Sequence, residues 1–194
     1  MNNKINTWKK YSHKKTLCPT LRIQTTWKKQ QTSNYTNMTP DEFNLRVYGI
    51  LMQEGQVLVS DELIGGRAVT KFPGGGLEFG EGTSECLVRE FDEEMDIDVQ
   101  VNSLYYINDF FQESAFNPRE QLVSIYYKVS QKGAKDIPIA KKPFAFPPQQ
   151  RQCFRWVKIK NLREVDFAYP VDQALVKILK QENKEQITSG IPTV

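Results

Sequence analysis

Three glutamates at helical spacing are the residues of this chain best suited to chemistry. Glu90, Glu93 and Glu94 stand at positions i, i+3 and i+4 of residues 83–95, whose apolar residues recur with a period near 3.6. This spacing predicts a helix with all three carboxylates on one face, where like charges repel each other. Arg89 can offset part of the repulsion, and a divalent cation such as Mg²⁺, which prefers oxygen ligands, would offset more. The alternative is an acidic helix face that contacts only solvent.

A glycine-rich segment precedes this helix. Residues 73–76 have the sequence Pro-Gly-Gly-Gly, and glycines allow backbone N–H and C=O groups to approach a ligand closely. Two further acidic residues, Glu78 and Glu81, follow before the helix begins. Because Mg²⁺ commonly bridges carboxylates to phosphate oxygens, the glycines beside the acidic helix favour a metal site over a merely solvated face.

Other catalytic chemistries have less support. The chain has 194 residues and one histidine, His13, which lies in a polar N-terminal segment, so we expect no histidine base or metal ligand in the body. The three cysteines, Cys18, Cys86 and Cys153, are far apart and odd in number. They argue against a disulfide scaffold or a cysteine zinc site and fit a reducing compartment. No apolar stretch approaches the roughly 20 residues of a membrane helix. We therefore expect a cytoplasmic protein with no membrane partner.

Charge is distributed unevenly along the chain. Residues 1–37 carry seven Lys, Arg22 and no acidic residue, a net charge of +8. From residue 38 onward, 18 Lys and Arg stand against 23 Asp and Glu, a net charge of −5. High net charge with few apolar residues is typical of disorder, so residues 1–37 are predicted to form a disordered basic extension. Its lysines and aromatic residues would also suit a nucleic-acid-binding arm, but we favour a solvated extension without a nucleic-acid partner.

The remaining sequence predicts one domain with a mixed sheet and two helices, an α+β fold. The helix over 83–95 can begin with Thr83 or Ser84 as its cap, and a second helix is expected from about Val171. Residues 131–152, rich in Pro and Lys, are expected to form an inserted loop or a lid. The strands are expected at residues 45–52, 56–60, 69–72, 97–107, 121–129 and 153–159.

The segment from Gly75 to Ile97 resembles the Nudix box, G-x5-E-x7-R-E-U-x-E-E-x-G-U, in which U is an apolar residue. One position departs, because Asp96 stands where the family has glycine. The order of strands and helices extends the resemblance over residues 43–183, and the chain is identified as a member of the Nudix hydrolase (MutT-like) family. The matching residues are Gly75, Glu81, Arg89, Glu90, Phe91, Glu93, Glu94 and Ile97.

The resemblance implies a fold and an activity. The fold is an α/β/α sandwich around a mixed β-sheet, with a Nudix domain at 43–183 between the extension, 1–37, and a C-terminal tail, 184–194. The activity is divalent-metal-dependent hydrolysis of the diphosphate bond in a nucleoside diphosphate linked to another moiety, with Mg²⁺ as cofactor and Mn²⁺ as substitute. The partner is thus a small nucleotide, and a homodimer is left open. The alternative is a Nudix-fold nucleotide-binding sensor without turnover.

The resemblance also assigns roles within the box. Glu90, Glu93 and Glu94 are implied as catalytic carboxylates that bind the metal, with the carbonyl oxygen of Gly74 as a further ligand. Arg89 is implied as a catalytic residue that orients Glu90 and Glu93. These roles agree with the shared helix face deduced from the spacing.

Two other box positions are implied to be structural. Glu81 resembles the family residue that stabilises the loop before and after the helix. Asp96 falls where the helix ends, a position that often adopts the left-handed conformation. Because Asp visits that conformation more readily than most residues, the departure from glycine is expected to cost about 1 kcal/mol or less.

The general base is left open. In many relatives it is a glutamate outside the box, often in a loop near the last strands, but residues 137–152 contain no Asp or Glu. Glu113 and Glu120 are the remaining candidates outside the box, each of which is equally expected as a surface charge. Glu90 itself could also serve.

The residues that select the substrate are also left open. Trp156 resembles a late-strand aromatic that more often packs in the core than against a base. Four further residues could contact a phosphate or a base or could simply be exposed: Arg46, Arg67, Phe144 and Phe146.

Overall fold

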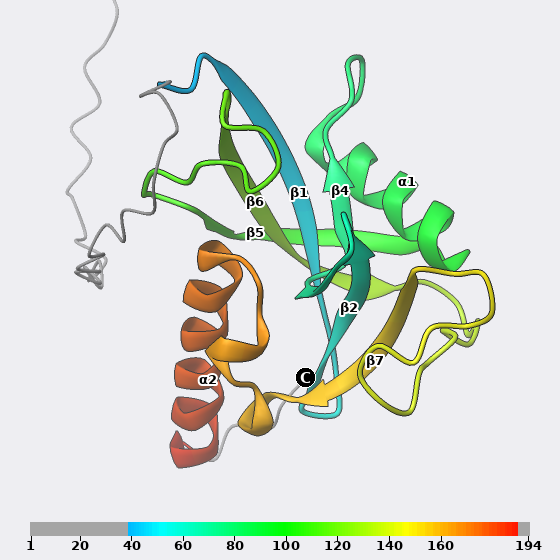
Figure 1. Cartoon of the computed structure of the whole chain (residues 1–194). Coiled ribbons are helices and arrows are strands. Elements are labelled where there is room, and N and C mark those ends of the chain that lie inside the picture. The colour runs from blue at the N-terminus through cyan, green and yellow to red at the C-terminus, as the bar shows by residue number, and fades with distance from the viewer. Residues whose placement is uncertain (1–38, 190–194) are drawn as a thin grey trace, which may run out of the picture. The chain divides into compact units, whose positions relative to one another are not determined.

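The computed structural model describes residues 39–189, whose helices and strands confirm the predicted α+β arrangement. The prediction for residues 1–37 lies outside the described residues. Figure 1 shows the elements, which are β1 (Glu42–Gln53), β2 (Gln56–Ile64), β3 (Arg67–Lys71), β4 (Gly74–Gly76), α1 (Thr83–Met95), β5 (Val99–Ile107), β6 (Glu120–Gln131), β7 (Gln152–Lys158) and α2 (Pro170–Ser189), with 3-10 turns at Ile159–Asn161 and Glu164–Asp166.

Two differences from the expected elements concern the site and the C-terminus. Residues 74–76, which lie outside the expected strands in the glycine-rich segment, form the short strand β4. Helix α2 continues to Ser189, so residues 184–189 of the expected tail are helical. Within the described part of the chain, no helix is long and apolar enough to cross a membrane.

The sheet brings the glycine-rich strand to the middle of β1. The strand order is β3-β2-β1-β6-β5, with β4 paired to β1 and β7 paired to β2. β1 and β6 are parallel, whereas β4 is antiparallel to β1, with Val47 opposite Gly75 and Tyr48 opposite Gly74. The sheet is therefore mixed, and the glycines are fixed against a central strand.

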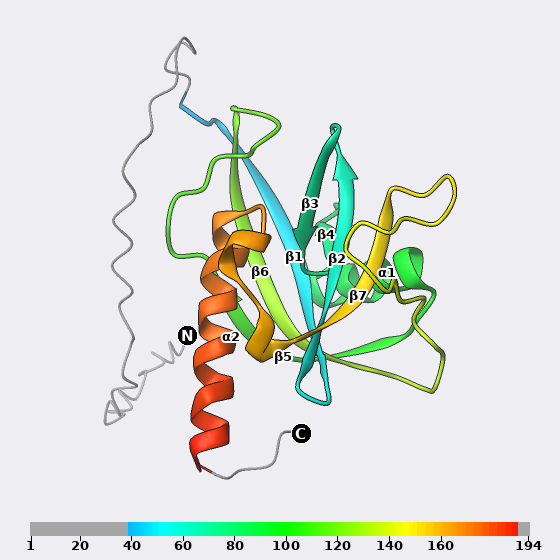
Figure 2. The same ribbon diagram turned by 60° about the horizontal axis from the view of Figure 1, so that its bottom comes forward.

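The two helices cover opposite faces of the sheet (Figure 2). Because successive side chains of a strand point to opposite faces, neighbouring residues of β2 enter different cores. Val57 and Val59 pack with the α2 residues Leu175 and Leu179, whereas Leu58 packs with residues of α1. One core lies between the sheet and α2 and the other between the sheet and α1, as expected for an α/β/α sandwich.

Close contact between α1 and β1 fixes the height of the helix above the sheet. A Cβ atom added to Gly49 of β1 would lie 2.6 Å from the ring of Phe91 in α1. Phe91 is fully buried. The missing side chain at Gly49 thus lets the acidic helix lie against the strand that also pairs with the glycines of β4.

Candidate active site

The loop after β4 leads directly into α1, which begins at Thr83 with Gly82 as its N-cap. The predicted caps, Thr83 and Ser84, are therefore wrong. The carboxylate of Glu85 reaches back and accepts a hydrogen bond of 2.6 Å from the Gly82 N–H. This contact satisfies a free backbone donor at the helix start without a capping hydroxyl.

The end of α1 has the predicted conformation. Asp96 is left-handed, with φ of 54° and ψ of 43°, and its N–H donates to the carbonyl of Asp92. Its carboxylate also pairs with Lys135. The aspartate that replaces the family glycine therefore adopts the backbone conformation typical of glycine at this position.

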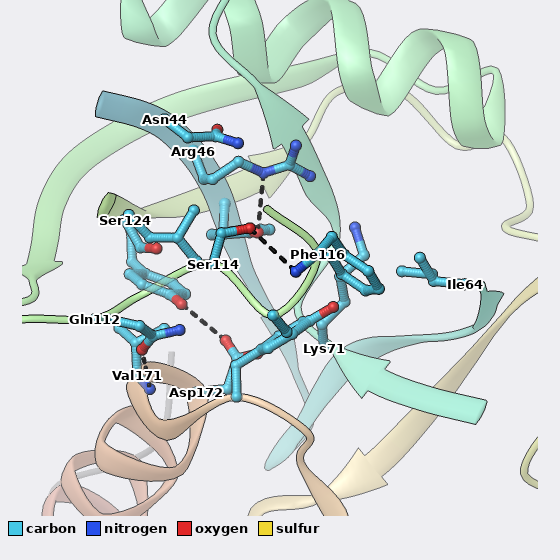
Figure 3. A pocket seen from close by; sticks show the side chains of 15 residues that line it. Asn44, Arg46, Ile64, Lys71, Gln112, Ser114, Phe116, Ser124, Val171 and Asp172 are labelled. Atoms are coloured by element: carbon cyan, nitrogen blue, oxygen red, sulfur yellow. Dashed lines mark hydrogen bonds between the residues drawn. The ribbon is translucent and has the colours of Figure 1, made fainter. Parts of the chain in front are cut away.

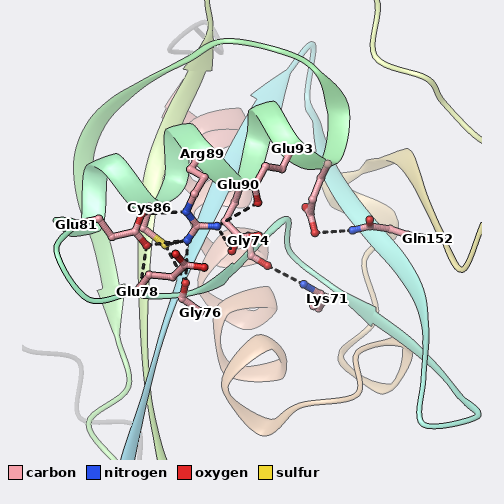
Figure 4. A network of polar contacts seen from close by, with 11 residues as sticks. Lys71, Gly74, Gly76, Glu78, Glu81, Cys86, Arg89, Glu90, Glu93 and Gln152 are labelled. Carbon is pink, nitrogen blue, oxygen red and sulfur yellow. Dashed lines mark hydrogen bonds and ion pairs between the residues drawn. The ribbon is translucent and has the colours of Figure 1, made fainter.

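Arg89 connects the loop to two of the helix carboxylates (Figure 4). Its Nε and Nη2 donate to both oxygens of Glu81, at 3.0 and 2.7 Å. Its Nη1 donates to Glu90 at 3.0 Å and to Glu93 at 3.2 Å, while Nη2 also donates to the Gly76 carbonyl. The hydrogen bonds from Arg89 lower the pKa of Glu81 to about 2. The guanidinium thus fixes the positions of Glu81, Glu90 and Glu93 at once.

Glu90 lies against the glycine strand. A Cβ atom added to Gly75 would lie only 2.1 Å from Glu90 Oε1 and 2.4 Å from Oε2. Any side chain at this position would displace the carboxylate. The absence of a side chain at Gly75 therefore makes room for Glu90, which explains physically why these two residue types occur together.

Glu94 lies away from Arg89 and is largely buried. Its Oε1 accepts a hydrogen bond of 2.7 Å from Gln152 Nε2 on β7, while its buried Oε2 has no partner within residues 39–189. Burial raises the pKa of Glu94 to about 7, against the opposing effects of Lys71 and Gln152. An unpartnered buried carboxylate oxygen is costly, so the position favours a ligand such as a cation.

The carbonyl of Gly74, expected as a metal ligand, contacts a lysine. Lys71 Nζ donates to Gly74 O at 2.7 Å and pairs with Glu62 at 2.9 Å. Lys71 is only 4% exposed, and its pairing with Glu62 compensates the charge of this buried ammonium group beside the glycine strand. A carbonyl oxygen has two lone pairs, and the contact leaves one of them for a second partner.

The structure thus places Glu90, Glu93 and Glu94 on one face of α1, but their carboxylates are not gathered. Within the described residues, no three His, Cys, Asp or Glu side chains are close enough to hold a metal ion as they stand. Glu93 has a side chain that is 60% exposed and is held by one hydrogen bond of 3.2 Å from Arg89. The chemistry of the donor set and the unpartnered oxygen of Glu94 fit a divalent cation.

A cavity of about 180 Å³ lies on the α2 side of the sheet, lined by residues of β1, β3, β6, the end of β2, the loop 108–119 and the start of α2 (Figure 3). Lys71, which binds the Gly74 carbonyl, is among its lining residues. Aromatic rings line it, and Tyr48 and Tyr126 are stacked with centroids 5.1 Å apart. Asp172 is fully buried and accepts a hydrogen bond of 2.8 Å from the Tyr126 hydroxyl. Burial raises the pKa of Asp172 to about 7. The cavity therefore combines aromatic walls with a polar end, as in sites for small organic ligands.

The two glutamates outside the box are not drawn to the helix carboxylates. Glu120 accepts hydrogen bonds from Asn44 at 2.6 Å and Asn117 at 2.8 Å, which hold its pKa below the usual range. Glu113 is exposed and pairs through its backbone with Gln121. A carboxylate with a lowered pKa is a weaker base, so the structure does not favour Glu120.

The residues considered for contacts with the substrate differ in their burial and contacts. Trp156 packs against the core on the α1 side, as expected, and Arg67 is exposed. Phe144 and Phe146 contact each other edge-on in the proline-rich loop, with centroids 6.1 Å apart. The Phe144 N–H donates to the buried Asp61 of β2, which ties this loop to the sheet and favours an inserted loop over a lid.

Three residues beside the site were not predicted: Lys71, Gln152 and Asp172. Lys71 carried a signal, because it stands two residues before the glycine-rich segment 73–76. Asp172 falls within the helix expected from about Val171, but its position gave no sign that it would line a cavity. Gln152 is 58 residues from Glu94, and nothing in the sequence pairs them.

Comparisons with known proteins agree with this geometry. The model of the NUDIX domain family matches residues 42–180. Among solved structures, the NUDIX hydrolase from Nitrosomonas europaea is 20% identical, with a TM-score of 0.56 over 80% of this chain and 78% of that one. The E. coli ORF135 protein is 18% identical, with a TM-score of 0.55 over 79% of this chain and 96% of that one. An ADP-ribose pyrophosphatase from Streptococcus suis 89-1591 is 17% identical, with a TM-score of 0.50 over 72% of this chain and 91% of that one. At these identities the structures share the fold.

Proposed function

The chain belongs to the Nudix family of pyrophosphohydrolases, and from this premise we propose that it hydrolyses the diphosphate bond of a nucleoside diphosphate linked to another moiety. Mg²⁺ is the proposed cofactor and Mn²⁺ its substitute. Water attacks one phosphorus, the P–O–P bond breaks, and the products are a nucleotide and the phosphorylated second moiety.

One observation carries the proposal: three glutamates share the face of α1 that lies against the glycine strand. Arg89 holds Glu90 and Glu93, and Gly75 leaves room for Glu90. Glu94 contributes a buried oxygen that has no hydrogen-bond partner among the described residues. Together with the Gly74 carbonyl, these groups supply the oxygen ligands that Mg²⁺ prefers.

Each part of the site has a distinct task in this proposal. A bound divalent cation would neutralise phosphate charge and lower the pKa of a water molecule. Glu90, Glu93 and Glu94 would hold the cation, and Arg89 would keep Glu90 and Glu93 oriented toward it. The adjacent cavity would receive the organic part of the substrate, with the aromatic rings of Tyr48 and Tyr126 excluding water.

A hydrolysis screen tests the proposal. The purified chain is assayed with and without Mg²⁺ against ADP-ribose, which the Streptococcus suis neighbour's name suggests, and against UDP-sugars, NADH and diadenosine polyphosphates. We expect metal-dependent product from at least one of them. Glu93→Gln and Glu94→Gln should each slow turnover about a hundredfold, a loss of about 3 kcal/mol of transition-state stabilisation.

Asp92→Asn is the matched control, because Asp92 lies on the same helix but is exposed and has no assigned role at the site. It should keep the wild-type rate. Equal rates for the wild type, Glu93→Gln and Glu94→Gln would overturn the proposal. Saturable nucleotide binding without product over hours would instead favour the sensor.

The cytoplasmic location remains a prediction, and a homodimer is left open. Both Cys86 and Cys153 are buried free thiols, which supports a reducing compartment. Fractionation of the cells that express the protein tests the location, and light scattering of the purified chain tests the oligomeric state.

A further inference from the structure

Two positively charged side chains lie near the Tyr48 ring, where the cavity meets the glycine strand. Arg46 Cζ lies 5.9 Å from the centroid of the Tyr48 ring, and Lys71 Nζ lies 5.5 Å from the same centroid. Both side chains line the cavity (Figure 3). An anion bound at this end of the cavity would be attracted by both side chains.

Arg46 keeps most of its hydrogen-bonding capacity. Its Nε donates to the Tyr48 hydroxyl at 3.3 Å, and no carboxylate lies within 4.0 Å of its guanidinium in residues 39–189. Its Nη1 lies 3.4 Å from the position that a Cβ on Gly76 would take, so the guanidinium borders the glycine strand. A half-buried guanidinium without an acidic partner is well suited to the planar, two-point binding of a phosphoryl group.

Lys71 has one N–H donor without a partner in the part of the chain that the structure describes. Its ammonium group has three N–H donors, of which Glu62 and the Gly74 carbonyl accept two, at 2.9 and 2.7 Å. The Glu62 carboxylate, paired with this ammonium group at 2.9 Å, stabilises its positive charge in the buried position. The third N–H belongs to a side chain that lines the cavity.

We propose that Arg46 and Lys71 together bind a phosphoryl group of the substrate at the end of the cavity nearest the glycine strand. The inference rests on the proposed function, since it names the residues that hold the phosphoryl group beside the organic moiety. It selects ligands that carry a dianionic phosphoryl or diphosphoryl group next to the part enclosed by the cavity.

The strands hold this pair in place before the ligand arrives. Arg46 and Tyr48 are on β1, and β4 pairs with the same stretch of β1, with Arg46 opposite Gly76 and Tyr48 opposite Gly74. Lys71 ends β3 and binds the Gly74 carbonyl. Donors fixed on paired strands lose little freedom on binding, which favours affinity.

Calorimetric titration with inorganic pyrophosphate, in EDTA and without divalent cations, tests the pair directly. We expect saturable binding by the wild type and at least tenfold weaker binding by Arg46→Gln and by Lys71→Met. Arg67→Met is the matched control, because Arg67 is an exposed cation on the same strand as Lys71 and should leave the affinity unchanged.

Lys71→Met leaves Glu62 without its partner, and that variant could fail to fold. The double variant Lys71→Met/Glu62→Gln removes both charges and should fold, with the same loss of pyrophosphate binding as Lys71→Met. If neither variant folds, Arg46→Gln decides the question. Wild-type affinity in Arg46→Gln or in either Lys71 variant, or no binding by the wild type, would overturn the inference.

The titration separates this inference from the proposed function, because it needs neither a metal ion nor turnover. Pyrophosphate binding that depends on Arg46 and Lys71 in a chain that hydrolyses nothing would leave the pair standing and reject the enzyme. Metal-dependent hydrolysis with unchanged pyrophosphate affinity in the variants would support the enzyme and reject the binding role of Arg46 and Lys71.

Discussion

The substitution Gly75→Ala tests whether the glycine strand exists to make room for Glu90. The new Cβ atom would lie 2.1 Å from Glu90 Oε1, whereas ordinary contacts are 3.4–4 Å. The carboxylate must therefore move by more than about 1 Å. A misplacement of that size typically slows an enzyme about a hundredfold, equivalent to about 2.7 kcal/mol.

The same substitution should leave the fold intact. The φ angle of Gly75 lies outside the left-handed region, so alanine can adopt its backbone conformation. Replacing glycine by alanine at such a position stabilises a protein by about 0.4–1 kcal/mol, because alanine lowers the conformational entropy of the unfolded chain. The displaced group is the end of a flexible side chain, so we expect the free energy of unfolding to change by less than about 1 kcal/mol.

The assay compares kcat and the melting temperature of Gly75→Ala with those of Gly82→Ala. Gly82 also precedes the catalytic face, but a Cβ atom there would meet nothing closer than 3.4 Å. We expect Gly75→Ala alone to lose activity. Wild-type kcat in Gly75→Ala with an unchanged melting temperature would show that the position of Glu90 does not matter for catalysis.

Three further predictions concern stability. Burial raises the folded-state pKa of Asp172 to about 7 from its ordinary 3.8, so its contribution to stability is complete below pH 3.8 and is lost as the pH rises through about 7. Denaturant titrations across pH should show this loss in the wild type and not in Asp172→Asn; parallel profiles would contradict it. Arg155→Leu should cost about 3–5 kcal/mol in the same titrations, because it removes the cation paired with the fully buried Asp61 and leaves only neutral hydrogen-bond donors, and a small loss would show that Asp61 is hydrated. Because Asp96 is left-handed, Asp96→Val should lower stability by about 1–2 kcal/mol while Asp96→Gly should not, and equal melting temperatures would refute this.

Local patterns predicted the parts of the site that lie within one stretch of chain. The i, i+3, i+4 spacing placed Glu90, Glu93 and Glu94 correctly on one face of α1, because helix geometry depends only on neighbouring residues. The left-handed conformation of Asp96 followed from the same local argument. The N-cap was missed because Glu85, rather than a hydroxyl before it, satisfies the backbone donor.

Contacts between distant segments could not be predicted in this way. Strand β4 has no side chains to show alternation, and only its pairing with β1 makes it a strand. Gln152 reaches Glu94 because β7 pairs with β2. The cavity is lined by several separate segments, so Lys71 of β3 and Asp172 of α2 line the same cavity only in the folded protein.

Counting bound Mn²⁺ by electron paramagnetic resonance tests the central claim most directly, namely that the carboxylates of α1 form a divalent-cation site. The wild type should take up Mn²⁺ saturably, and the variant Glu90→Gln/Glu93→Gln/Glu94→Gln should lose that uptake while keeping its melting transition. Uptake that is absent from the wild type, or unchanged in the folded triple variant, would contradict the account.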